Sequence, residues 1–135
     1  MNLKYVTLYV LLFIGFTGCK VFKKGDKSNS KIEDFDQFYD RFHKDAEFQM
    51  SRIFFPIDGE FVDETGGKKW TKQNWQVMKV KIYDVNVKGY KKSFEKTNDS
   101  FYQKVWIPNS GFISEYRFKL INQKWMLVYA LESNL

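Results

Sequence analysis

SKIEDFDQFYDRFHKD, residues 30–45, has the pattern of an amphipathic helix at the start of a folded domain. Ser30 and Glu33 have the spacing of a capping box, in which a serine caps the helix and a glutamate three residues later reaches back to it. Apolar side chains then recur at helical spacing and form one stripe, while acidic and polar residues cover the other side. This stripe consists of Ile32, Phe35, Phe38, Tyr39 and Phe42. The stretch therefore predicts a helix that buries an aromatic face.

The residues after this helix predict a change from helix to sheet. Asp45 has the position of a second N-cap and opens a short helical turn in which Phe48 faces inward. Pro56 is expected to close this region, because proline cannot continue a helix and is poor in a central strand. Glycines within residues 58–69 indicate a loop or a hairpin, and residues 71–74 indicate one capped helical turn.

The second half of the chain has the two-residue periodicity of strands. Residues 108–111 indicate a turn, and residues 122–123, Asn-Gln, indicate a tight turn between the last two strands. The final strand carries apolar side chains on both faces, which predicts a central place in the sheet. The predicted strands are residues 77–87, 101–107, 112–121 and 124–131.

The same alternation assigns side chains to faces in the last hairpin. The first of its strands places on one face Tyr116, Phe118 and Leu120. The second places on one face Trp125, Leu127, Tyr129 and Leu131. Because helices precede a run of strands, residues 30–135 are expected to form a single α+β domain, with N-terminal helices packed on a curved antiparallel sheet.

The first 18 residues have the layout of a secretory signal peptide. Lys4 gives a positive start, residues 5–16 are nearly all apolar, and two small residues precede Cys19. A membrane-spanning helix needs roughly 20 apolar residues, and lysines follow this run at once, so a spanning anchor fits less well. Residues 16–19, FTGC, resemble the bacterial lipobox. This resemblance implies that Cys19 is acylated and that residues 1–18 are removed.

Residues 19–29 are expected to comprise the acylated cysteine and a flexible tether. The tether is predicted because the residues after Cys19 have no periodicity and carry several lysines. These lysines either attract an anionic membrane surface or keep the linker solvated. By resemblance to lipoprotein sorting rules, Lys20 after the cysteine implies an outer-membrane protein facing the periplasm, with cell-surface exposure as the alternative. Lysines elsewhere alternate with acidic residues, so the formal net charge of +6 does not indicate a nucleic-acid partner.

Three motifs cover the first half of the domain: FxxFxxxFxxD from Phe35, FQxSRIxFP from Phe48 and WxxxxW from Trp70. They resemble an uncharacterised family of small bacterial lipoproteins that is known as a domain of unknown function. The ending YRFKLINQKW, residues 116–125, resembles the final hairpin of nuclear transport factor two-like domains. These resemblances imply a cone, in which a curved sheet wraps on helices around a cavity. They imply no particular reaction, since that fold hosts enzymes, binders and assembly modules.

One arginine and four aromatic residues are the candidates for lining such a cavity. Arg52 stands among apolar neighbours and needs either a carboxylate, from Asp45, Glu47 or a strand, or an anionic ligand. The aromatic candidates, for which a core position is the alternative, are Trp75, Trp106, Tyr116 and Trp125. The chain has no glycine-rich phosphate loop, no calcium loop and no set of histidines and cysteines for a metal, so no cofactor is expected.

Together these features favour a lipid-anchored, non-enzymatic envelope domain that binds a small ligand or a partner protein. The alternative is an isomerase or hydrolase of the cone fold, with His43 or a buried carboxylate as the general base. His43 is the only histidine and lies at the edge of the apolar stripe, where a structural role is the simpler interpretation. An open cavity lined by aromatic side chains would favour a ligand, whereas an exposed apolar sheet face would favour a protein partner.

Overall fold

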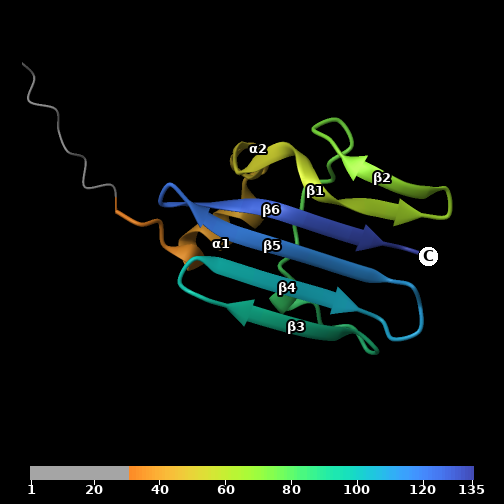
Figure 1. The fold of residues 1–135 in the computed structure, drawn as a ribbon. Coiled ribbons are helices and arrows are strands. Elements are labelled where there is room, and N and C mark those ends of the chain that lie inside the picture. The colour runs from red at the N-terminus through yellow and green to blue at the C-terminus, as the bar shows by residue number, and fades with distance from the viewer. Residues whose placement is uncertain (1–30) are drawn as a thin grey trace, which may run out of the picture.

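The structure, a computed structural model, describes residues 31–135 as two helices packed on one face of a six-stranded sheet (Figure 1). This arrangement confirms the α+β class. The helices are α1 (Phe35–Lys44) and α2 (Ala46–Ser51). The strands are β1 (Ile53–Asp63), β2 (Gly66–Trp70), β3 (Lys91–Lys96), β4 (Ser100–Trp106), β5 (Ile113–Ile121) and β6 (Lys124–Ser133). A 3₁₀ turn, η1 (Ile82–Asp84), lies in the long connection between β2 and β3.

The sheet is mixed, whereas the sequence predicted an antiparallel sheet. Its strand order is β2-β1-β6-β5-β4-β3, and every neighbouring pair is antiparallel except β1 and β6. The backbone carbonyl of Arg52, just before β1, accepts a hydrogen bond from the N–H of Leu127 near the start of β6. The helices thus place the start of β1 at the end of the sheet at which β6 begins. The two strands therefore run in the same direction, which the long chain between them permits.

The first helix is capped by Asp34 and not by the expected box of Ser30 and Glu33. The Asp34 side chain accepts a hydrogen bond from a backbone N–H of the first turn at 2.9 Å. Ser30 lies outside the described residues, and Glu33 is bound to Arg52 instead of the helix end. The aromatic stripe is buried as predicted, but Ile32 precedes the helix and is 61% exposed.

Pro56 lies inside β1, which corrects the expectation that it closes the region before the sheet. The pairing of β1 is irregular around this proline, over residues 53–58 against β6 and over residues 57–61 against β2. Proline has no N–H to give to a sheet, so it is tolerated where an irregularity interrupts the hydrogen-bond ladder. The hairpin predicted within residues 58–69 is confirmed as the β1–β2 pair.

Residues 77–87 form no strand, which corrects the prediction for this segment. Residues 71–90 instead cross the inner face of the sheet, which is the face that carries the helices. Val80 and Ile82 would share one face of a strand, yet Val80 is exposed and Ile82 is buried, so the apolar alternation does not mark a strand face. β3 also has no counterpart among the predicted strands, and it is a lysine-rich edge strand whose sequence KKSFEK has almost no apolar residues.

The final hairpin is confirmed as β5 and β6, joined by Asn122 and Gln123, which have positive φ angles of 48° and 66°. A two-residue loop with positive φ matches the twist of the strands that it joins. β6 lies between β1 and β5, which confirms its central place. The predicted face of β6 is wrong beyond Leu127, because a register shift places Tyr129 on the outer face and Ala130 on the inner face. An extra residue in one strand reverses side chains in this way.

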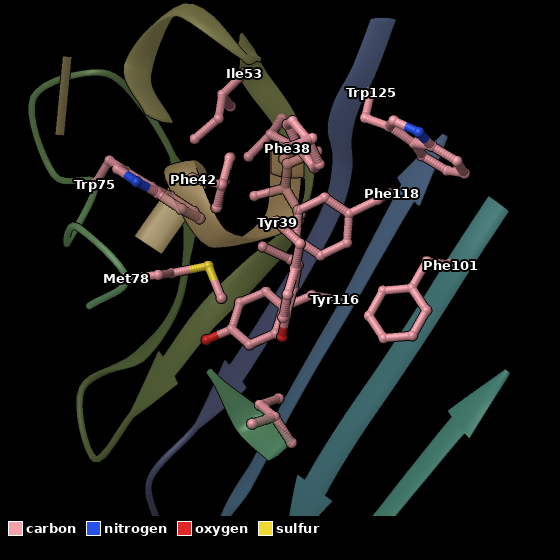
Figure 2. Close-up of a cluster of buried hydrophobic side chains, with 14 of the residues drawn as sticks. Phe38, Tyr39, Phe42, Ile53, Trp75, Met78, Phe101, Tyr116, Phe118 and Trp125 are labelled. Atoms are coloured by element: carbon pink, nitrogen blue, oxygen red, sulfur yellow. The ribbon is translucent and has the colours of Figure 1, made fainter. Parts of the chain in front are cut away.

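The core forms where the aromatic stripe of α1 packs on the inner face of the sheet (Figure 2). Phe38 and Tyr39 contact Phe118 of β5 edge to face, with ring centroids 5.8 Å apart in each pair. Phe35 packs in the same way on Trp125 of β6, at 4.9 Å. Aromatic pairs of this geometry contribute about 0.5–1.5 kcal/mol beyond the burial of their area. This packing fills the part of the inner face beneath α1 and fixes the helix on the sheet.

Candidate functional site

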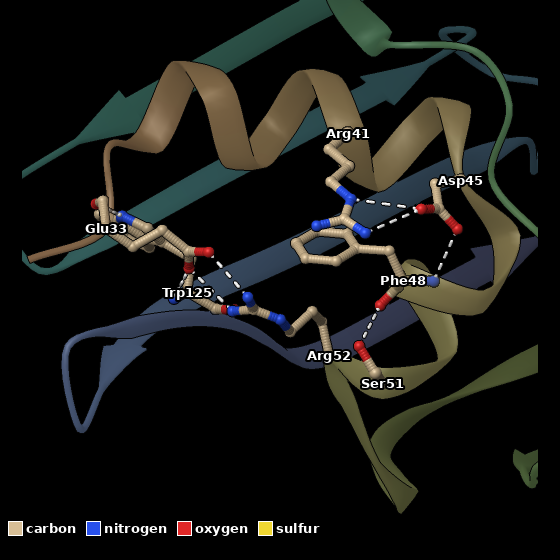
Figure 3. A network of polar contacts seen from close by, with 7 residues as sticks. All are labelled: Glu33, Arg41, Asp45, Phe48, Ser51, Arg52 and Trp125. Atoms are coloured by element: carbon tan, nitrogen blue, oxygen red, sulfur yellow. Dashed lines mark hydrogen bonds and ion pairs between the residues drawn. The ribbon is translucent and has the colours of Figure 1, made fainter.

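Arg52, a predicted ligand-lining residue, lies in an ion pair beside the start of α1 (Figure 3). Its guanidinium donates to the two carboxylate oxygens of Glu33, at 2.7 and 2.8 Å, and to the carbonyl of Trp125 at 3.2 Å. Its partner is thus Glu33, whereas the sequence pointed to Asp45, Glu47 or a strand acid. The reason is that the chain before α1 runs alongside the β5–β6 turn and is hydrogen-bonded to it. Arg52 therefore ties the beginning of the domain to its last strand.

The Phe48 ring of α2 contacts the guanidinium groups of two arginines (Figure 3). The guanidinium carbons of Arg41 and Arg52 lie 4.1 and 4.4 Å from the centre of this ring. Asp45 caps α2 as predicted, because one of its oxygens accepts from the Phe48 N–H at 2.9 Å and the other accepts from Arg41 at 3.1 Å. Cation–π contacts at partly exposed sites contribute about 0.5–1 kcal/mol. This cluster joins the two helices and leaves neither arginine facing a cavity.

The three tryptophans predicted to line a cavity lie apart from one another. Trp75 is buried in the core, where its indole N–H donates to a buried side-chain carbonyl at 3.0 Å. Trp125 is buried against α1, and its indole N–H donates to a backbone carbonyl at 3.1 Å. Trp106 lies on the outer face of β4, with the Lys104 ammonium 5.3 Å from its ring. Of the five candidates, Tyr116 is the one that lines the pocket between the sheet and the segment that crosses it.

This pocket, the inner pocket, is open and lies between residues 76–90 and the inner face of β4, β5 and β6. Its volume of about 390 Å³ is within the range of pockets that hold small ligands. Most of the side chains around it are apolar: Val77, Met78, Val80, Ile82, Val85, Tyr90, Val105 and Phe112. The polar side chains around it are Gln76, Lys79, Ser114, Tyr116 and Glu132.

Tyr116, Ser114 and Glu132 form the polar floor of the inner pocket. The Tyr116 hydroxyl donates a hydrogen bond to the Glu132 carboxylate, and Ser114 lines the pocket beside Tyr116 on the same face of β5. Burial, and then the negative charge of Glu132, raise the pKa of Tyr116 well above its ordinary value of 10.0. The hydroxyl therefore remains protonated at neutral pH and keeps donating to the carboxylate.

A second polar pair borders this floor. The Tyr39 hydroxyl of α1 donates to the side-chain carbonyl of Gln103, which is fully buried on β4. Gln103 stands opposite Tyr116 in the β4–β5 register and next to Val105 on the inner face, and both of these neighbours line the pocket. The amide nitrogen of Gln103 has no hydrogen-bond partner among the described residues. Buried amides are rarely left in this state, so Gln103 adds an unpaired polar group to the interior beside the floor.

His43, the candidate base, is buried but does not line the inner pocket. Its Nδ1 lies 2.8 Å from the carbonyl of Tyr39, so this nitrogen carries a hydrogen and donates it. The imidazole packs on the rings of Tyr39 and Phe42. Burial lowers the pKa of His43 below its ordinary value of 6.5, so the ring is neutral at pH 7.

Ser114, Gln103 and Glu132 are the floor residues that the sequence analysis did not single out. Gln103 carries a usable signal, because strand alternation puts it on the same face as Phe101 and Val105. A polar residue on an apolar face indicates a buried partner. Glu132 carries no such signal, because the register shift in the last hairpin decides which face it joins.

Cys19 and the predicted signal peptide and tether lie outside the described residues. Within residues 31–135, no helix is both long enough and apolar enough to cross a membrane. In the same part of the chain, no three side chains of His, Cys, Asp or Glu are grouped so that they could hold a metal ion.

Two solved structures share this arrangement of helices and sheet. An NMR structure of a protein from Bacteroides uniformis is 20% identical, covers 78% of this chain and 78% of its own, and has a TM-score of 0.56. A crystal structure of a cystatin-like protein from Bacteroides caccae is 23% identical, covers 76% of this chain and 78% of its own, and has a TM-score of 0.60. At these identities the likeness shows the fold alone. No curated protein is significantly similar to the chain.

The family follows from a comparison with family models. The model described as "-like:-like" matches residues 33–134. This match spans both helices and all six strands of the domain. The chain therefore belongs to this family, which is an uncharacterised family of domains of unknown function.

Proposed function

We propose that the protein is a non-enzymatic binding domain of the bacterial envelope, held there by a lipid on Cys19, and that its inner pocket takes a small ligand. The observation that carries this proposal is the pocket itself, an open space of about 390 Å³ with apolar walls and a polar floor. Ligand sites generally combine a mainly apolar lining with a few polar groups that fix the orientation of the ligand. The floor residues supply that second element.

We also infer that the fold is the cone of nuclear transport factor two-like domains. Support for this finer assignment comes from the helices that precede the sheet, from the hairpin that ends it, and from a pocket between the sheet and the chain that crosses it. In such a cone the pocket lies on the inner face, where this chain has its open space.

The outer face of the sheet favours a small ligand in the pocket over a partner protein that docks on the sheet. The outer face of the sheet mixes the aromatic side chains of Tyr102 and Trp106 with charged ones. On that face Lys104 and Glu115 approach each other to 4.0 Å, and the Arg117 guanidinium lies 5.8 Å from the ring of Tyr102. Interspersed charges are typical of a solvated surface, whereas a docking face for a protein is a continuous apolar patch.

The proposal is tested by filling the pocket. Val85 lines the pocket, whereas Val87, two residues later, is 55% exposed and does not line it. The domain without its signal peptide would be titrated with a library of neutral, cationic and anionic amphiphilic fragments and followed by amide NMR. We expect ligands that shift the amides of β4 and β5 around Val105 and Ser114. Val85→Trp should abolish these shifts and Val87→Trp should leave them.

Binding that survives Val85→Trp, or shifts confined to the outer face, would overturn the assignment of the pocket. The partner-protein alternative would then gain, and a pull-down from envelope extract with the outer-face variant Trp106→Glu would address it.

An enzyme of isomerase or hydrolase type is the second candidate, because one carboxylate, that of Glu132, faces the pocket. In this case Glu132 would be the general base, since His43 does not line the pocket. Its proton transfer would need a substrate placed within hydrogen-bond reach of the carboxylate. The fragment mixture recovered after incubation with the protein distinguishes the two functions. Unchanged fragments support binding alone, and conversion that is lost in Glu132→Gln supports catalysis.

A further inference from the structure

Glu132 is a negative charge in the inner pocket that no cation of the described chain balances. It lies on β6 and accepts a hydrogen bond from the Tyr116 hydroxyl, which is a neutral donor. The ion pairs within residues 31–135 join other residues, and none includes Glu132. One neutral hydrogen bond satisfies part of the hydrogen-bonding capacity of a carboxylate, which has two oxygens and about four acceptor sites.

The lysines nearest to the pocket are engaged elsewhere or exposed. Lys92 shares an inner-face row with Val105, Ser114 and Glu132 through the strand registers. Its ammonium, however, donates to the carbonyls of residues 83 and 85, at 3.1 and 2.8 Å. Lys79 lines the mouth of the pocket, but its side chain is exposed, so solvent screens its charge.

The walls next to Glu132 are suited to an apolar or cationic group. Tyr90 and Phe112 line the pocket and pack edge to face, with ring centroids 5.3 Å apart. Aromatic rings attract a cation through their faces and also bury aliphatic groups. A carboxylate surrounded by such walls is less well solvated than one on an open surface, so a positive charge that binds beside it gains more than it would in water.

We propose that the inner pocket selects a small amphipathic cation, whose ammonium group donates to the Glu132 carboxylate while its apolar body packs on the pocket walls. This inference rests on the proposed function, since it names the class of ligand for the same pocket. The ammonium takes the acceptor sites of Glu132 that Tyr116 leaves unused. Ser114, beside Tyr116, offers a further hydroxyl oxygen to the same group.

The test compares three probes that share a six-carbon chain and differ in their polar end. Hexylamine is cationic at pH 7, hexanol is neutral and hexanoate is anionic. Each is titrated into the folded domain, and the Kd is measured by amide NMR. We expect hexylamine to bind most tightly, hexanol more weakly and hexanoate least. Raising the salt from about 0.05 to about 0.5 M should weaken hexylamine alone, because its charge is attracted to the carboxylate, whereas hexanoate is repelled by it and hexanol is neutral.

A pair of matched variants separates Glu132 from the charge of the whole domain. Glu132→Gln keeps the size of the side chain and an acceptor for Tyr116, and should weaken hexylamine about tenfold or more while leaving hexanol within about twofold. Glu115→Gln removes the same charge from the outer face and should change neither Kd. If Glu132→Gln does not fold, the order of affinity of the three probes for the wild-type domain still decides whether the pocket prefers a cation.

The outcomes also separate this inference from the proposed function. Equal binding of hexylamine and hexanol, or a hexylamine Kd that Glu132→Gln leaves unchanged, overturns the choice of a cation but keeps the pocket as a ligand site. If none of the probes shifts the pocket amides and the fragment library also fails, both proposals are wrong.

Discussion

Gln49 is a fully buried amide in which every hydrogen-bonding group has a partner, in contrast to Gln103. Its nitrogen donates to the carbonyls of Phe42 and Met78, at 2.7 and 2.9 Å. Its oxygen accepts from the indole of Trp75 at 3.0 Å and from the N–H of Met78 at 2.9 Å. One side chain thereby connects α1, α2 and the segment that covers the pocket. A fully satisfied buried network specifies a single arrangement of the elements that it joins.

Replacing Gln49 with leucine is therefore expected to lower the free energy of unfolding by about 2–4 kcal/mol. Leucine fills a similar volume, but it leaves two buried donors and two buried acceptors without partners. Urea unfolding followed by tryptophan fluorescence measures the change. Gln37→Leu on the exposed side of α1 is the control and should stay within about 0.5 kcal/mol of the wild type. A loss below about 1 kcal/mol in Gln49→Leu would show that water replaces the missing bonds.

The stability of the domain should fall as the pH drops below about 6.5 because of His43. Burial lowers the pKa of this residue in the folded state below its ordinary value of 6.5. Below pH 6.5 the unfolded chain therefore binds a proton that the folded domain does not, so the free energy of unfolding decreases as the pH falls. The slope approaches about 1.4 kcal/mol per pH unit where the difference is one full proton. Thermal unfolding at a series of pH values measures it.

His43→Gln keeps a donor for the Tyr39 carbonyl and should flatten the profile below pH 6.5. The neighbouring carboxylate of Asp40 does not account for the slope there. Lys44 and Lys81 lower the pKa of Asp40 to about 2, so this carboxylate stays ionised in the folded domain where the His43 slope begins below pH 6.5. A slope of equal size in the variant would assign the acid sensitivity to other groups.

At the scale of the elements, both edge strands of the sheet are protected by charge. β2 contributes the sequence GGKKW and β3 contributes KKSFEK, so lysines line both edges. An unprotected edge pairs with other chains, and lysines are a common means of preventing it. The same composition explains why β3 was not predicted, because a strand built for an edge lacks the apolar alternation that identifies strands in a sequence.

The turn between β5 and β6 should become more stable when Gln123 is replaced by glycine. Gln123 has a φ of 66°, which costs a residue with a side chain about 1 kcal/mol relative to glycine. Part of this gain is lost because glycine has more freedom in the unfolded chain, so we expect an increase of about 0.5 kcal/mol in the free energy of unfolding. Gln123→Ala, which keeps a β-carbon at the same φ, should give no increase. Chemical denaturation of the two variants makes the comparison.

Elements whose pattern is local could be predicted from the sequence, and those that depend on distant contacts could not. α1 and the last hairpin follow from spacing and turn residues within the elements themselves. The segment of residues 71–90 resembles a strand in its alternation, yet it takes its shape from the inner face that it covers. The direction of β1 is likewise set by its contact with β6 and not by its own residues.

The candidate site shows the same division at the scale of the whole molecule. Tyr116 was predicted to line a cavity, and it does lie on the pocket floor. Arg52 and the tryptophans could not be placed, because their partners come from segments far away in the chain, such as Glu33 for Arg52. Glu132, on which the ligand class rests, reaches the pocket through a register shift that composition and periodicity do not show.

At the scale of the whole protein, Cys19 is expected to be the point of membrane attachment, and the domain without it is expected to be soluble. The core lies within residues 35–130, so a protein that begins at Lys20 is expected to be soluble and folded. Cys19→Ala in the full chain should take up no labelled fatty acid and should remain an uncleaved precursor. Label in the alanine variant, or a shortened protein that fails to fold, would contradict the lipid anchor. Protease added to intact cells separates a periplasmic from a surface location.

The central place of β6 affects the order in which the protein folds as it is synthesised. A chain that is made from its N-terminus contains α1, α2 and β1 long before residues 124–133, yet most of β1 pairs with those residues. Until they are made, β1–β2 and β3–β4–β5 are two parts of a sheet that β6 has yet to join, and long-range pairing of this kind is slow to form. The domain is therefore expected to complete its fold only after β6 has been made, when this strand joins β1 to β5 in the middle of the sheet.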